Sequence, residues 1–137
     1  MKVLVMYVNE FRYEPAEKNL ESAKEITEGG KFDDAILAFI QVEQKDEEKD
    51  VQSREKKLVN HLKWTARKNN TQRVILHSFA HLSESKASAD FTCELFNLAE
   101  KRLKNAGFET AQTPFGYFLN LNINAPGYSL ARIWADL

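Results

Sequence analysis

The chain has 137 residues, of which 43% are hydrophobic and 28% are charged, and its formal net charge is −1. This length predicts one domain over residues 1–137 with a core that needs no disulfide or metal staple, and the balanced charge gives no overall attraction to nucleic acid. No apolar run is long enough to span a membrane, and the single cysteine, Cys93, excludes an internal disulfide and a cysteine-rich zinc site. Because the first residues also lack a signal-peptide pattern, we expect a cytoplasmic protein.

The N-terminal half of the chain predicts strands followed by a helix. Lys2–Val8 is apolar on both faces, which is typical of a central strand. Asn9–Glu17 alternates like a second, half-exposed strand, and Asp33–Glu43 contains a further apolar strand. We expect the charged run Gln44–Asp50 to be a solvated loop. In Gln52–Asn69 apolar residues recur at four-residue steps, which predicts a helix with one face on a core.

The C-terminal half adds one strand, one helix and two more strands. Arg73–Phe79 reads as a strand, and Ser85–Asn105 reads as a helix whose start a nearby serine, Ser83 or Ser85, would cap. Phe108–Gln112 and Phe115–Asn124 follow as strands, the second with leucine and isoleucine alternating against asparagine. This order predicts an α/β fold in which two main helices pack on a mixed β-sheet.

The loop after the strand Arg73–Phe79 is the first candidate site, because ligands of α/β proteins are usually held at strand ends. His81 in this loop is the leading residue, since an imidazole can exchange a proton near neutral pH or position a polar substrate. The alternative is that His81 only bonds a loop carbonyl. We expect His77 to be a packed or bonded strand residue. The serines nearby lack a Gly-x-Ser-x-Gly elbow and an acid partner, which disfavours a serine nucleophile.

The segment Thr113–Phe118 is the second candidate site. Pro114 removes a backbone donor and fixes φ, while Gly116 permits close backbone approach. Two interpretations remain open: a β-bulge or kinked strand entry, or a pocket wall whose aromatic faces stack on a nucleotide base. No zinc, Walker or dinucleotide motif is present, so nothing in the sequence supports a metal or a cofactor.

Both candidate segments resemble the signature motifs of one family, the N-terminal editing domain of archaeal threonyl-tRNA synthetase. The matching runs are Phe79-Ala80-His81-Leu82-Ser83 and Pro114-Phe115-Gly116-Tyr117. The runs Met1–Leu4, Tyr13-Glu14 and Ala38–Glu43 fit the same pattern. The resemblance covers nearly the whole chain, in order and with compatible spacing, and its motifs are specific in combination rather than singly.

The resemblance implies a fold like that of D-aminoacyl-tRNA deacylases, a homodimer, and hydrolysis of seryl-tRNA mischarged on threonine tRNA without a metal or cofactor. The implied partners are the 3′ end of threonine tRNA and a synthetase catalytic module. The implied pocket holds the terminal adenosine and the aminoacyl group mainly through backbone atoms, while the tRNA 2′-hydroxyl helps to activate water. His81 then has a positioning role, and the substrate-binding residues are Phe79, Ala80, Phe115, Gly116, Tyr117 and Phe118.

Three positions depart from the family pattern. Ser78 stands where the family has a proline, Leu119 where it has a lysine, and Arg132 where it has a glutamate. Hydrolysis survives these changes if it depends on backbone groups and the RNA hydroxyl. If it depends on the lost side chains, the chain is a non-catalytic or diverged tRNA-binding or dimerisation module. A D-aminoacyl-tRNA deacylase is a third possibility, which the related fold alone suggests.

Overall fold

The computed structural model describes all 137 residues and has six strands and three α-helices. The strands are β1 (Lys2–Lys18), β2 (Gly30–Gln41), β3 (Arg73–Ser78), β4 (Glu109–Gln112), β5 (Tyr117–Asn124) and β6 (Arg132–Asp136). The helices are α1 (Gln44–Glu47), α2 (Val51–Lys68) and α3 (Ala89–Asn105), with a 3-10 turn, η1, at Ser129–Ala131. None of the helices is long and apolar enough to cross a membrane. The elements confirm the predicted α/β class.

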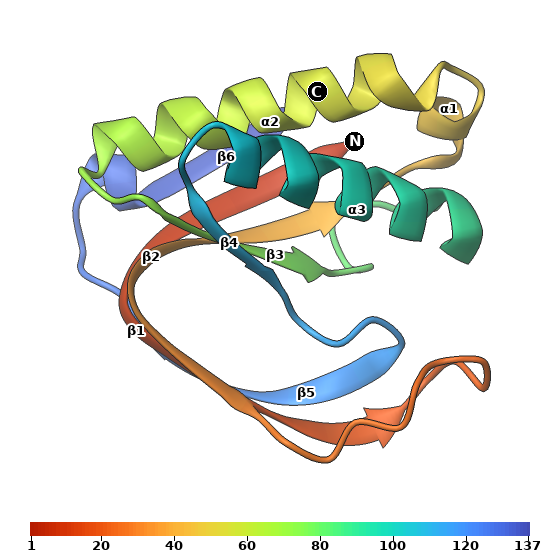
Figure 1. Ribbon diagram of the computed structural model, residues 1–137, viewed down its shortest axis with the longest axis horizontal. Coiled ribbons are helices and arrows are strands. Elements are labelled where there is room, and N and C mark those ends of the chain that lie inside the picture. Colours follow the sequence, from red (N-terminus) through yellow and green to blue (C-terminus); the bar gives the residue numbers. More distant parts are fainter.

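All six strands join one mixed sheet of order β4-β3-β2-β1-β5, in which β6 also pairs with β1. The contacts of β1 with β2, β5 and β6 are antiparallel, and those of β3 with β2 and β4 are parallel. The first half of β1 pairs with β6 and its second half pairs with β5. Because strands twist along their length, β1 and β2 curl strongly, and β5 lies far below the helices in Figure 1.

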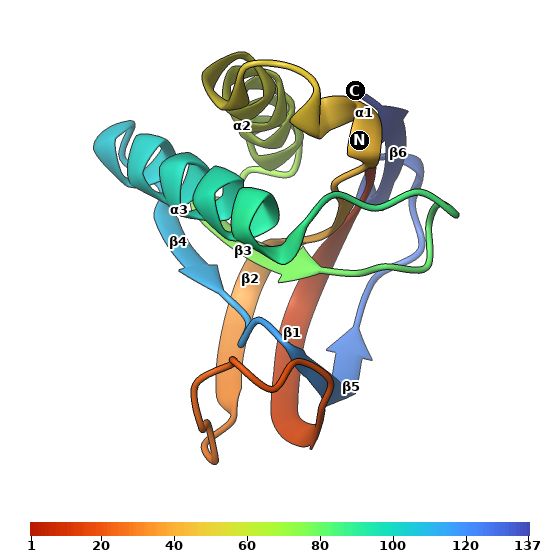
Figure 2. The same ribbon diagram turned by 90° about the vertical axis from the view of Figure 1, so that its right-hand side faces the viewer.

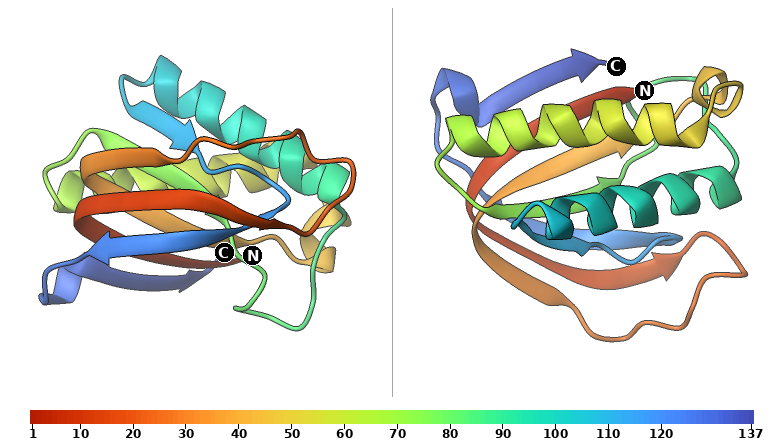
Figure 3. Two further views of the ribbon diagram at one scale, coloured as in Figure 1. Left: turned by 90° about the horizontal axis from the view of Figure 1, so that it is seen from below. Right: turned by 45° about the horizontal axis from the view of Figure 1, so that its top comes forward.

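The curl of the sheet creates two apolar clusters on its two faces. Helices α2 and α3 cover one face (Figure 3, right), where buried residues such as Val3, Leu62 and Leu95 form the larger cluster. The smaller cluster lies inside the curl and includes Phe39. Phe79, in the loop after β3, packs against it. The core of the curl therefore positions the first candidate segment.

Capping residues define both long helices. The Asp50 side chain accepts hydrogen bonds from the first backbone N–H groups of α2, and Ser88 does the same for α3, which satisfies donors that a helix start leaves unpaired. The prediction that Ser83 or Ser85 caps α3 was wrong by one turn. Those two serines bond instead to the end of β2 and the residues that follow it.

Two further sequence predictions were wrong. Lys2–Val8 and Asn9–Glu17 are one continuous strand, β1, because both parts pair with the same partner strand in one register. The charged run Gln44–Asp50 is not simply a solvated loop. It contains α1, and within it Asp46 is buried and forms an ion pair of 2.6 Å with Arg54. An opposite charge in the core offsets the cost of removing that carboxylate from water.

Candidate functional site

A cleft of about 510 Å³ lies between the two candidate segments. One wall is the end of β3 and the loop after it, from His77 to His81, and the facing wall is Pro114–Leu119. Figure 2 shows the molecule from the side on which the β3–α3 loop and the β4–β5 loop lie. The other lining residues come from the end of β2, the start of α3, β5 and the neighbouring loops: Asn19, Leu20, Ile40, Gln41, Val42, Lys86, Ala87, Ala89, Thr92 and Leu121.

Every predicted site residue except one lies at this cleft. The cleft-lining set comprises Ser78, Phe79, Ala80, His81, Phe115, Gly116, Tyr117, Phe118 and Leu119. Arg132 is the exception: it begins β6, is exposed, and its guanidinium donates a 2.8 Å hydrogen bond to the carbonyl oxygen of Pro126. The charge reversal at Arg132 therefore does not change the charge of the cleft lining.

His81 is exposed and is held by packing rather than by hydrogen bonds. Its ring centre lies 5.0 Å from that of Phe79 in an edge-on arrangement, and the Phe79 ring lies 5.1 Å from that of Phe39 in the core. This aromatic series connects the loop to the smaller apolar cluster. A histidine that acts as a base is usually oriented by a hydrogen-bonded acid, and no carboxylate lines the cleft. The arrangement therefore fits a positioning residue.

His77 connects the two walls. It is buried, with 6% of its surface exposed, and its Nδ1 lies 2.8 Å from the hydroxyl oxygen of Thr113, where the second wall begins. Burial lowers the pKa of His77 to about 4, because the apolar surroundings disfavour the charged imidazolium. His77 is therefore neutral near pH 7. Its burial and its contact with Thr113 confirm the prediction of a packed, bonded strand residue.

The second wall is attached to the segment between β1 and β2. Gly116 has φ of +85°, and a Cβ atom added to it would lie 2.7 Å from the Cβ of Ala23. The backbone N–H of Asn19 donates to the Gly116 carbonyl at 2.8 Å. The Tyr117 hydroxyl accepts from Ile26 N–H at 3.1 Å. The close approach that Gly116 permits is thus to the Ala23 and Leu20 side chains of this segment, which supports the wall from behind.

Apolar side chains cover the part of this wall that faces solvent. Phe118 is 50% exposed and Leu121, also on β5, is 40% exposed. Leu119 lies between them along the strand and is half-buried at the cleft. An exposed aromatic ring beside a cleft provides a stacking surface for a nucleotide base.

The cleft has an uneven charge. No aspartate or glutamate lines it, and Lys86 is its only lysine or arginine. Lys86 is exposed and forms no ion pair within 4.0 Å, so its charge is free to attract an anion. Sequence reasoning missed Lys86 because it lies in an irregular loop. The signal that could have identified it is that it is the sole cationic residue between β3 and α3.

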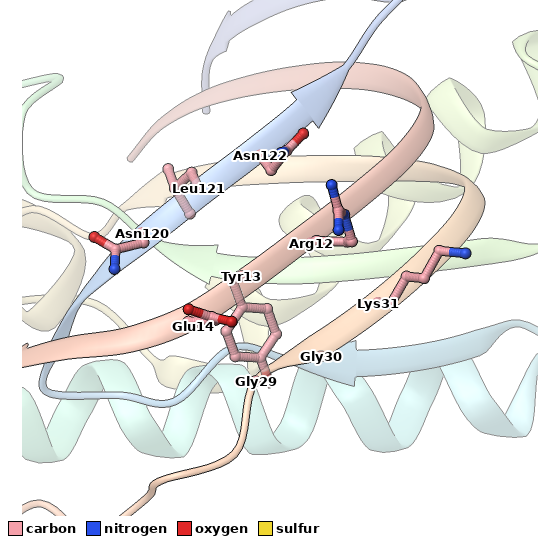
Figure 4. Close-up of a pocket in the computed structure, with 9 residues that line it drawn as sticks. All are labelled: Arg12, Tyr13, Glu14, Gly29, Gly30, Lys31, Asn120, Leu121 and Asn122. Carbon is pink, nitrogen blue, oxygen red and sulfur yellow. The ribbon is translucent and has the colours of Figure 1, made fainter.

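A second hollow of about 590 Å³ lies over β1, β2 and β5, and Figure 4 shows its lining side chains. Its two cationic residues, Arg12 and Lys31, each form an ion pair with Glu10, at 3.0 and 3.7 Å. Leu121 lines both hollows. Because its cations are already paired, this hollow is less suited than the cleft to an anionic ligand.

The fold has a clear counterpart among solved structures. The structure of a c-Myc DNA unwinding element binding protein matches with a TM-score of 0.67 and covers 100% of this chain and 99% of that one. The sequence identity is 12%, so this likeness shows the fold alone. The class of protein is thereby defined as an α/β domain with a curled mixed sheet, the fold that this protein shares with that structure, which confirms the predicted fold class.

Sequence comparisons identify the family within this class. The sequence model of the archaea-specific editing domain of threonyl-tRNA synthetase matches residues 1–137, and the chain belongs to this family. Threonine–tRNA ligases of Thermococcus onnurineus and Pyrococcus furiosus are 30% and 28% identical to it over 136 residues. Each match covers 97% of this chain and 22% of the relative. The chain therefore spans about a fifth of the length of these relatives.

Proposed function

We propose that this domain hydrolyses seryl-tRNA mischarged on threonine tRNA, in the cytoplasm and in concert with a threonyl-tRNA synthetase catalytic module. The observation that carries the proposal is that both signature segments line one cleft. An active site that accepts threonine cannot strongly exclude the smaller serine by binding alone, so a separate hydrolytic site provides the missing discrimination.

The cleft offers contacts for the 3′ end of a tRNA. The exposed ring of Phe118 is placed to stack on a base, and Lys86 is placed to attract a phosphate. With no carboxylate in the lining, nothing there repels the RNA backbone. These features support a single-stranded RNA end as the ligand despite the net charge of −1 for the whole chain.

The proposed reaction requires little from protein side chains. Water attacks the ester carbonyl carbon, the bond between that carbon and the ribose oxygen breaks, and the ribose oxygen takes up a proton to release serine and free tRNA. Backbone N–H groups can stabilise the oxyanion that forms on the carbonyl oxygen, and the tRNA 2′-hydroxyl assists the water. His81 holds the aminoacyl end in place, since its ring rests on Phe79.

A deacylation assay tests this proposal. Threonine tRNA charged with serine or with threonine is incubated with the protein, and the release of each amino acid is compared with the spontaneous rate. We expect faster release of serine only. Release of serine at only the spontaneous rate would contradict the proposal. His81→Ala is expected to raise KM more than it lowers kcat, and complete loss of turnover with intact binding would contradict catalysis led by backbone and RNA.

A second candidate function is a non-catalytic tRNA-binding module, which the apolar Leu119 at the cleft favours. Leu119→Lys places a cation at this position, and Leu121→Lys, also on β5 and at the cleft, is its matched control. If hydrolysis needs the cation, only Leu119→Lys accelerates release of serine. If the wild type, Leu119→Lys and Leu121→Lys all bind the RNA but none releases serine, the result would favour the non-catalytic module. Release of D-amino acids would instead indicate a D-aminoacyl-tRNA deacylase.

We also propose that the domain forms a homodimer. Strand β6 pairs only with β1, so its outer edge has unpaired backbone groups, and such an edge can pair with another chain. Trp134 on β6 is 58% exposed, and Leu130 and Tyr128 just before this strand are also exposed. Sedimentation equilibrium tests this proposal: we expect a mass of twice 15.8 kDa, and a monomer at every concentration would contradict it.

A further inference from the structure

Gln41 is a buried polar residue at the end of an apolar strand. It ends β2 directly after the buried run Ala35–Ile40, and 3% of its surface is exposed. Burying an amide costs free energy unless its hydrogen-bonding groups find partners, and an apolar side chain would meet the needs of packing alone. A buried glutamine at this position therefore needs hydrogen-bond partners inside the protein.

Those partners all lie in the loop that follows His81. The Gln41 Oε1 accepts hydrogen bonds from the N–H groups of Leu82 and Ser83 at 2.6 and 2.7 Å. The Gln41 Nε2 donates to the carbonyl oxygens of Ser83 and Ser85 at 2.7 and 3.0 Å. A glutamine amide has two acceptor sites and two donor hydrogens. The side chain thus uses its full hydrogen-bonding capacity on three loop residues, Leu82, Ser83 and Ser85.

Neighbouring residues reinforce this attachment without replacing it. The Ser83 hydroxyl donates to the Glu43 carboxylate at 2.7 Å, and the backbone N–H of Gln44 donates to the Ser85 hydroxyl at 3.1 Å. Burial of Glu43 favours its neutral form, but hydrogen bonds from the Met1 amino group and from Ser83 outweigh that effect and lower the pKa of Glu43. The loop is therefore joined to the end of β2 by a connected polar network.

The attached loop lies between two residues that face the cleft. His81 precedes Leu82 directly, and Lys86 follows Ser85 directly. A loop of this kind samples many conformations unless bonds offset the entropy of ordering it. The four bonds of Gln41 thus restrain the backbone that separates the imidazole of His81 from the ammonium group of Lys86.

We propose that Gln41 is a positioning residue of the cleft, which holds Leu82–Ser85 so that His81 and Lys86 both meet the bound tRNA end. This inference rests on the proposed function, because it takes the tRNA end as the ligand. Gln41 acts through the loop rather than on the reacting ester. A small displacement of groups around a reacting centre can cost up to about 10²-fold in kcat/KM, so the effect of losing this attachment is measurable.

The test uses two variants of Gln41 and one matched control. Gln41→Leu removes all four bonds at similar volume, and Gln41→Glu retains acceptors for Leu82 and Ser83 while it loses the donors. The control is Gln112→Leu, because the Gln112 amide also donates two hydrogen bonds, to Asn97 and Glu100 at 2.9 and 2.7 Å, but does not line the cleft. The measurements are amide hydrogen exchange at Leu82 and Ser83, kcat and KM for release of serine, and the thermal midpoint.

We expect Gln41→Leu to make both amides exchange faster and to lower kcat/KM by up to about 10²-fold, with KM rising more than kcat falls, as in His81→Ala. We expect Gln41→Glu to be intermediate, and Gln112→Leu to match the wild type in amide exchange and in kcat/KM. Unchanged amide exchange in Gln41→Leu, an unchanged kcat/KM in Gln41→Leu, or an equal loss in Gln112→Leu would overturn the inference. If the wild type releases no serine, the proposed function fails separately. The affinity for an RNA microhelix ending in CCA then decides: a loss confined to the Gln41 variants supports the positioning role, and unchanged affinity overturns it.

Discussion

The two walls of the cleft are held in place by different means. The loop from Phe79 to Ser85 is attached to the end of β2 by hydrogen bonds to the buried side chain of Gln41 and by aromatic packing on Phe39. The second wall enters β5 at Tyr117, where it pairs with β1, and its turn from Pro114 to Tyr117 leans on the mostly exposed segment between β1 and β2 through a few backbone and hydroxyl contacts. The first wall is thus attached to the core of the sheet, whereas the turn of the second wall depends on a surface segment.

This difference indicates how the cleft divides its tasks. Opening the His81 loop would leave the buried amide of Gln41 without partners, which is costly, so the His81 wall is expected to stay in one conformation. The segment that supports the turn from Pro114 to Tyr117 is mostly exposed, so that turn is expected to open at a lower free energy. A precise wall suits the positioning of an ester, and a more adjustable wall suits admission of an RNA end.

The largest expected effect concerns His77, which joins the two walls. The pKa of His77 is lowered to about 4 in the folded protein from an ordinary value near 6.5, so between these pH values the unfolded chain binds the additional proton. The contribution of His77 to the free energy of unfolding is therefore fully present above about pH 6.5. It falls by up to about 3 kcal/mol as the pH drops toward 4. Urea unfolding at several pH values measures this loss.

A variant without His77 distinguishes the contribution of this histidine to the pH dependence from that of carboxylates that titrate over a similar pH range. In His77→Gln the difference in unfolding free energy from the wild type is expected to shrink as the pH falls through this range. A difference that stays constant with pH would show that His77 does not contribute the predicted slope.

The next largest effect concerns the close approach behind the second wall. Gly116→Ala adds a Cβ in a left-handed conformation against Ala23 and is expected to lower the free energy of unfolding by about 2 kcal/mol. The matched control is Gly107→Ala, where φ is +90° but a Cβ would meet nothing within 4 Å. It is expected to cost about 1 kcal/mol. Equal losses in denaturant unfolding would mean that the contact with Ala23 adds nothing.

A smaller effect is expected from the hydroxyl that supports this wall. Tyr117→Phe removes the bonds to Ile26 and Lys24 and is expected to cost about 1 kcal/mol and to speed proteolytic cleavage within residues 19–29. Tyr128→Phe is the control, because its hydroxyl bonds to Asn69, away from the cleft. Faster cleavage of this segment in the control as well would argue against a local support by Tyr117.

The smallest effect concerns the charge at the rim of the cleft. Lys86→Gln is expected to weaken RNA binding a few-fold and to reduce the slope of log affinity against log salt by about 0.7, the value for one phosphate contact of a single strand. Lys101→Gln on α3, also exposed and not at the cleft, is the control. Fluorescence titration of a CCA-ended RNA measures both slopes. An unchanged slope in Lys86→Gln would exclude a phosphate contact.

The sequence allowed much of the fold to be predicted, because the relevant patterns are local. Four-residue spacing located α2, and the apolar runs located β1 and β2. The start of α3 was missed because several serines can cap a helix equally well in sequence, and only the competing bonds of Ser83 and Ser85 to the β2 end select Ser88. The single strand β1 was divided in two because its curl changes which side chains are buried along its length.

The sequence by itself determined which residue types are available at the site: an imidazole after a strand, and a proline and a glycine between aromatic rings. Only the tertiary structure decided how they are used. It places the two segments on one cleft, packs Gly116 against the side chains of Ala23 and Leu20, removes Arg132 from the site and adds Lys86 and Gln41 to it. The physical reason is that charge, burial and hydrogen-bond partners in the cleft come from residues far apart in the chain, which meet only when the sheet curls.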